Sequence, residues 1–203
     1  MLAAYGDLRF SIHVGNSLQA IGRSGRIEAI EGTQLHRVDG ISAKDFIERE
    51  TGRAVLQTDR GTLSLLVCDV EDSDEKSLRS IIPDLLDTGG SLGLFGGIPR
   101  GHSVQVCVAQ PEDMVAEVHA IAKAASASGK GAAAALVISC SGRKVLLGAQ
   151  IKHETSALTQ AFAPDLPLAG FTSFGEIAPL RRADGYTCNL FHNMTYVLLV
   201  IEQ

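Results

Sequence analysis

A thiol, a guanidinium and a carboxylate follow two apolar stretches in the C-terminal half of the sequence. Cys140-Ser141-Gly142-Arg143 ends the first stretch, and Gly170-Phe171-Thr172-Ser173-Phe174-Gly175-Glu176 ends the second. Backbone N–H groups at a helix start bind carboxylate or phosphate, and a guanidinium adds to that affinity. A carboxylate such as Glu176 accepts a ligand amine. We therefore predict that the two strand ends meet at a site for a small polar molecule.

The same residues allow two other interpretations. Arg143 and Glu176 would form a purely structural ion pair if no ligand separates them. Cys140 would be a candidate nucleophile at a helix start beside an arginine, but a nucleophile needs a base within reach. His153 lies further along the same segment, and no base adjoins Cys140 in the sequence. We therefore expect a binding site without catalysis, and keep a Cys140 enzyme as an alternative.

A third polar pair, His192-Asn193, precedes the closing apolar stretch and joins the same pocket if that stretch pairs with Leu168–Phe174. No two histidines lie four residues apart on one predicted helix, and no histidine has carboxylates near it at the spacing of metal ligands. We therefore expect no metal site. The predicted ligand-binding set is Cys140, Ser141, Gly142, Arg143, Gly170, Phe171, Gly175, Glu176, His192 and Asn193.

Composition limits the classes of partner. The 203-residue chain is 45% apolar and only 5% aromatic, with a net charge of −5. An acidic chain repels phosphate backbones and anionic membrane surfaces, and single-strand binding relies on aromatic platforms, so we expect neither nucleic acid nor membrane as partner. Four cysteines without a C-x-x-C pair indicate reduced thiols. No leader pattern and no apolar stretch of about 20 residues is visible, so we expect a cytoplasmic protein.

These functional residues require a mixed fold to position them. Alternating apolar residues and short turns predict about ten strands joined mainly by hairpins, as at 26–30 and 34–38. Helical spacing and caps predict four or five helices, including one from Ser42 to Gly52, one over 78–86 and one after Pro111. The fold class is therefore α+β with mostly antiparallel, mixed sheets.

Three of these motifs resemble those of the FIST sensory family. They are C-x-x-R at 140–143, G-F-x-x-x-G-E-I at 170–177 and H-N-x-T at 192–195. The resemblance implies a ligand-sensing module of bacterial signal transduction that binds small molecules such as amino acids or small carboxylates. It also implies an output partner such as a histidine kinase or a chemotaxis or cyclic-dinucleotide protein.

The resemblance further implies a division of the chain. Residues 1–52 would be the end of the family's N-terminal half, and residues 53–203 a FIST C-terminal-like domain. Some family members bind haem and sense nitric oxide through a histidine, so a haem sensor using His153 or His192 is the alternative to a module without cofactor. An oligomer is compatible with either interpretation.

Overall fold

The structure is a computed structural model and describes residues 6–68, 76–83, 88–127, 131–182 and 184–202. It confirms an α+β fold with mostly antiparallel sheets. The chain forms two compact units. Unit 1 comprises Met1–Asn16, Pro111–Leu190 and Thr195–Gln203, and unit 2 comprises Ser17–Gln110 and Phe191–Met194. Each unit has its own hydrophobic core.

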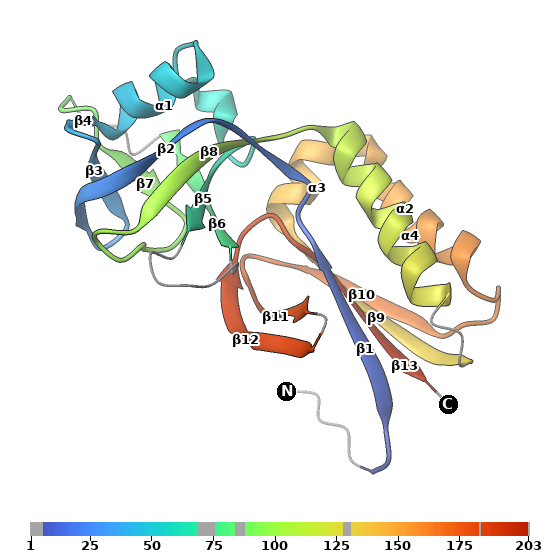
Figure 1. The fold of residues 1–203 in the computed structure, drawn as a ribbon. Helices are drawn as coiled ribbons and strands as arrows, with labels where there is room; N and C mark the ends of the chain where they lie inside the picture. Colours follow the sequence, from blue (N-terminus) through green and yellow to red (C-terminus); the bar gives the residue numbers. More distant parts are fainter. Residues whose placement is uncertain (1–5, 69–75, 84–87, 128–130, 183, 203) are drawn as a thin grey trace. The chain divides into compact units, whose positions relative to one another are not determined.

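Unit 1 is built on a four-stranded sheet in the order β1-β13-β9-β10 (Figure 1). The first three strands pair antiparallel, whereas β10 pairs with β9 in parallel. A two-stranded hairpin of β11 and β12 follows β10 in the sequence. The strands are β1 (Arg9–Gly15), β9 (Ala132–Cys140), β10 (Leu168–Ser173), β11 (Glu176–Arg182), β12 (Gly185–His192) and β13 (Tyr196–Glu202).

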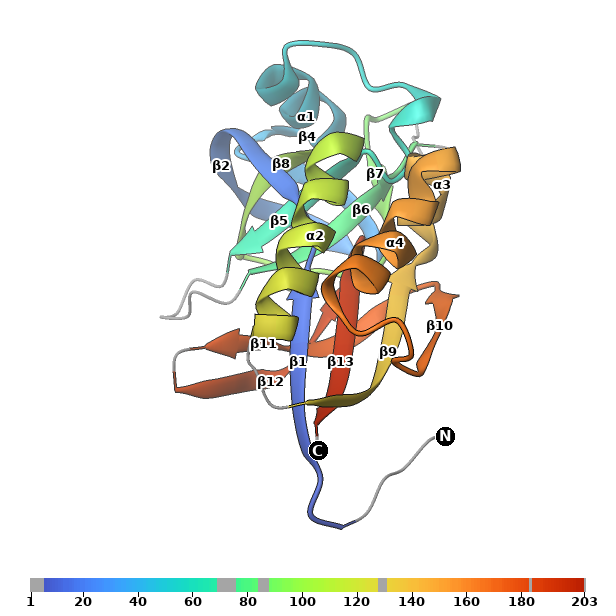
Figure 2. The ribbon, with the colours of Figure 1, turned by 90° about the vertical axis from the view of Figure 1, so that its right-hand side faces the viewer.

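Two helices, α2 (Pro111–Ala127) and α4 (Lys152–Ala161), cover one face of this sheet (Figure 2). Their apolar faces and the sheet form the core of unit 1, whose members include Val118, Ala157, Leu158, Tyr196 and Leu198. Burial of each large apolar side chain of this kind contributes about 1.5–3 kcal/mol to the stability of the fold. The short helix α3 (Ser141–Leu147) follows β9 directly and runs through a 3-10 turn (Gly148–Ile151) into α4.

Unit 2 is a small closed barrel. Strand β2 pairs with β8 through its first half and with β3 through its second, so six strands form a ring in the order β2-β8-β5-β6-β7-β3. Closure leaves the ring without a strand that has a neighbour on one side only. The strands are β2 (Leu18–Glu31), β3 (Gln34–Val38), β4 (Ile41–Ser42), β5 (Leu63–Cys68), β6 (Lys76–Ile82), β7 (Leu92–Leu94) and β8 (Ser103–Ala109).

The predicted caps of the first helix are confirmed. Helix α1 (Ala43–Thr51) begins after Ser42, whose hydroxyl accepts a hydrogen bond from the Asp45 N–H at 3.1 Å. It ends at Gly52, which adopts a φ of 70°, a conformation that is costly for residues with a Cβ. The helix buries Phe46 and Ile47 in the core of unit 2.

The helix predicted over 78–86 is wrong at its start, because β6 (Lys76–Ile82) occupies that part; residues 84–87 lie outside the described residues. The apolar spacing of Leu78 and Ile81 is compatible with a helix and with a strand. The segment forms a strand because it pairs with β5 on one side and with β7 on the other. The described residues form 13 strands and three separate α-helical segments, since α3 continues into α4. Helical segments are therefore fewer than predicted.

A buried carboxylate anchors the loop between α1 and β5 in unit 2. Asp59 accepts two hydrogen bonds from the Arg53 guanidinium, at 2.7 and 2.9 Å, and one from the Leu56 N–H at 2.7 Å. Burial alone would raise the pKa of Asp59, but the hydrogen bonds from Arg53 and Leu56 outweigh it and lower the pKa below its usual value. The ionised form therefore stabilises the loop.

Replacing Asp59 should remove stability that depends on pH. A carboxyl with a lowered folded-state pKa stabilises the fold above its unfolded pKa, and this contribution disappears as the pH falls through the folded value. Asp59→Asn should lower the free energy of unfolding by about 1–2 kcal/mol at neutral pH. The loss should not be larger, because the Arg53 partner is half exposed and water screens the ion pair. The difference from wild type should shrink below about pH 4. Urea unfolding over a pH series measures this, with the exposed Asp45→Asn as control; a constant difference down to acid pH would contradict it.

Candidate functional site

A cavity of about 330 Å³ lies in unit 1 between α4 and the β9–β10 pair. Ligand pockets in proteins begin at about this size, so the cavity suits a small molecule. Its wall is partly apolar, with Ile151 and Leu158 from the helical segment and Phe171 from β10. Polar groups also line it, namely Ser139, Glu154, Thr155 and Thr172.

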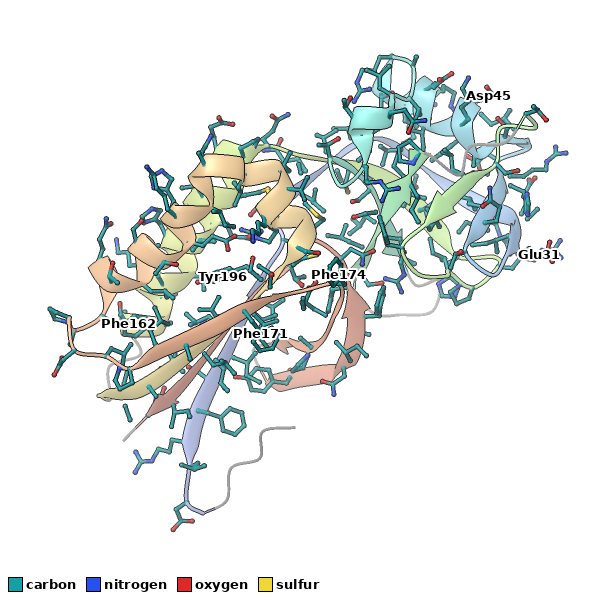
Figure 3. The ribbon with its side chains drawn as sticks, turned by 180° about the vertical axis from the view of Figure 1, so that it is seen from behind. Glu31, Asp45, Phe162, Phe171, Phe174 and Tyr196 are labelled. Atoms are coloured by element: carbon teal, nitrogen blue, oxygen red, sulfur yellow. The ribbon has the colours of Figure 1, made fainter. Side chains whose placement is uncertain are left out.

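Strand register turns the polar groups of the sheet toward the helices. Ser139 of β9 lies opposite Tyr196 of β13 and Thr172 of β10. Residues opposite each other in a sheet share a face, and Tyr196 belongs to the core beneath α2 and α4. Figure 3 shows Tyr196 between the sheet and these helices. Ser139 therefore faces the helix layer as well.

A buried ion pair supports this side of the cavity. The Arg143 Nε donates to the Glu154 Oε1 at 2.7 Å, with Arg143 fully buried and Glu154 only 6% exposed. The guanidinium also donates to the Met114 carbonyl at 3.4 Å and lies 5.6 Å from the Tyr196 ring centroid. Because Arg143 balances its charge, Glu154 is available as an ionised hydrogen-bond acceptor at the cavity wall.

Two buried hydroxyls at this place have no hydrogen-bond partner in the described part of the chain: Ser139 Oγ and Tyr196 OH. A buried hydroxyl without a partner costs about 1–3 kcal/mol, so such groups require an explanation. Burial raises the pKa of the Tyr196 hydroxyl above its usual value, and the nearby Glu154 carboxylate raises it further, while Arg143 opposes the shift. Tyr196 therefore stays a neutral donor.

The Cys140-Ser141-Gly142-Arg143 motif forms the junction of β9 and α3. Cys140 is buried at the N-cap, and its N–H donates to the Thr195 carbonyl at 3.0 Å. Ser141 and Gly142 are half-buried in the first turn of a helix of seven residues. The carboxylate that Arg143 contacts is Glu154, which the motif did not include.

The Gly170–Glu176 motif divides between two roles. Gly170 and Phe171 belong to β10 and line the cavity. Glu176 is buried beyond the Gly175 bend, where it accepts hydrogen bonds from the Thr195 hydroxyl at 2.7 Å and from the Ser173 hydroxyl. This carboxylate therefore ties the end of β10 to the start of β13.

His192 and Asn193 belong to unit 2 rather than to unit 1. Both are buried, and the Asn193 Oδ1 accepts a hydrogen bond from the Ser80 N–H at 3.1 Å. The Arg79 guanidinium donates to the Phe191 carbonyl at 2.9 Å. The segment at 191–194 is thus fastened to the barrel strand β6.

Sequence reasoning missed Glu154, Ser139 and Tyr196. A signal for Glu154 was present, because it lies three residues after Ile151 and four before Leu158, on the apolar face of the helical segment. A carboxylate on a buried face requires a partner. Ser139 and Tyr196 gave no such signal, because only strand register brings them together.

The comparison with known families identifies the class of protein. The FIST C domain model matches residues 35–179, so the chain belongs to the FIST C domain family, a family of sensory domains associated with signal transduction. Searches of curated proteins and of solved structures found no match. The family match crosses residue 52, and the domain boundary predicted there stays a prediction.

Two further findings concern the described residues. None of their helices combines the length and the apolar character needed to cross a membrane. Nor do they bring three or more histidine, cysteine, aspartate or glutamate side chains together in a group that could hold a metal ion.

Proposed function

We propose that the chain is a non-enzymatic binding module that recognises a small molecule in the cavity beneath α4 and passes the signal to an output partner. The observation that carries the proposal is the pair of buried, unpartnered hydroxyls on the side of the sheet that faces this cavity and its ion pair. A ligand in contact with Ser139 would satisfy a group that the described protein leaves unsatisfied. Membership of the FIST C family supports a sensory role.

The lining favours an amino acid or a small carboxylate as ligand. Glu154 would accept hydrogen bonds from an amine, and the Ser139, Thr155 and Thr172 hydroxyls would donate to a carboxylate. Ile151 and Leu158 would contact an apolar side chain. A histidine kinase, or a chemotaxis or cyclic-dinucleotide protein, would receive the signal in a cytoplasmic pathway.

A calorimetric screen of amino acids and small carboxylates tests this proposal. Ser139→Ala removes one hydroxyl from the cavity wall. It should lower the affinity for any compound that the screen identifies about tenfold, the equivalent of one hydrogen bond of about 1.4 kcal/mol. Ser156→Ala is the matched control, because the Ser156 hydroxyl, on α4, already donates to the His153 carbonyl and Ser156 does not line the cavity. A panel without any binder, or a binder unaffected by Ser139→Ala, would contradict the proposal.

A further inference from the structure

The edge strand of unit 1, β10 (Leu168–Ser173), carries exposed apolar side chains along an open edge. It pairs with β9 on one side and has no strand partner on the other among the residues that the structure describes. Phe171 is 60% exposed, and Phe174, just after the strand, is 93% exposed. Figure 3 shows both side chains along this strand and the bend that follows it. Exposed backbone donors and acceptors at such an edge are a template for another extended strand.

The opposite edge of the sheet is protected in a way that β10 is not. On β1, the Ile12 N–H donates to the Tyr186 hydroxyl at 3.0 Å, so the β11–β12 hairpin occupies part of that edge. Natural sheets also protect their edges with charges or proline. From Leu168 to Gly175 the chain has neither.

Charge indicates which occupant fits. The whole chain carries a net charge of −5, which opposes association of copies through most of its surface. The uncharged β10 edge is a place where two copies meet without like charges facing each other. Antiparallel pairing about a two-fold axis places each β10 against its own equivalent, which is the self-complementary arrangement of a closed dimer.

From this geometry we infer that two copies of the chain associate through antiparallel pairing of their β10 strands, with Phe171 packed against the partner copy. A ladder of six residues buries less than the roughly 800 Å² per partner of a standard stable interface, so the dimer is weak and depends on concentration. Residues 168–172 of the same strand also line the cavity, but the inference does not require a bound ligand.

Sedimentation equilibrium over a wide range of concentration tests the inference. The wild-type chain should pass from monomer to dimer, and Phe171→Lys should weaken the dimer at least about tenfold, because it puts a positive charge on each of the two paired strands. Val145→Lys is the control, since Val145 is also an exposed hydrophobic residue of unit 1, at 79%, but lies on α3. A monomer at every concentration, or equal dimerisation of the two variants, would overturn the inference.

Hydrogen exchange of the wild-type chain gives a second readout that needs no variant. Amides of residues 168–173 should gain protection as the concentration rises, while amides of the barrel strands should not. Protection that rises elsewhere and not in β10 would overturn the inference even if a dimer forms.

Discussion

Arg143→Ala should be among the most destabilising single changes in unit 1, costing about 3–5 kcal/mol, because it leaves the buried Glu154 carboxylate without its counter-charge. The change also removes a cation from beside the Tyr196 ring. Urea unfolding of the purified chain measures the loss. Lys144→Ala is the control, since Lys144 is the exposed neighbour of Arg143 and its replacement should change stability by less than about 0.5 kcal/mol.

A double variant separates the charge effect from lost packing. Arg143→Met combined with Glu154→Leu replaces both charges with apolar groups and should recover most of the stability, since no unpaired buried charge remains. If Arg143→Ala alone were nearly neutral, the ion pair would not be buried as described. Loss of ligand binding in an Arg143 variant would therefore report instability, and for this reason Ser139 is the better probe of the cavity.

Gly170→Val should detach β10 from β9 and cost about 2–3 kcal/mol. A Cβ at Gly170 would lie 2.6 Å from the Val137 carbonyl oxygen and 3.1 Å from the Val137 Cβ. The first of these is a backbone atom of the neighbouring strand, which cannot move aside as a flexible side chain does. Hydrogen exchange should show faster exchange at residues 168–173, together with lower stability to urea.

Ala169→Val tests whether this cost is specific to the position. Ala169 is the exposed neighbour of Gly170 in the same strand, and a β-branched residue suits an exposed strand position. The variant should be neutral within about 0.5 kcal/mol. Equal destabilisation by both changes would contradict the close approach of β10 to β9.

Local chemistry in the sequence predicted the parts of the fold that depend on neighbouring residues. Ser42 and Gly52 mark the ends of α1 because a cap is a contact of nearby groups. Leu78 and Ile81 led to a wrong prediction of a helix because their spacing suits one. The segment is a strand because it pairs with partners that lie elsewhere in the sequence. Periodicity in a short apolar stretch does not distinguish the two elements.

The same distinction explains the site. Cys140–Arg143 and Gly170–Glu176 were correctly recognised as the ends of two strands, which pair directly as β9 and β10. The partner of Arg143 was misjudged, because Glu176 follows a strand end whereas Glu154 lies on a helix facing inward. Ser139 and Tyr196 become neighbours only when β13 enters beside β9, and no spacing in the sequence encodes that pairing.

The position of β13 has a consequence for the order of folding during synthesis. The ribosome makes β1 and β9 long before Tyr196–Glu202, yet in the finished sheet β13 separates them and pairs with both. The barrel strands of unit 2, all within Leu18–Ala109, are complete much earlier. The barrel can therefore form on the nascent chain while β1 waits for its partner, and unit 1 reaches its native pairing only after translation has passed residue 202.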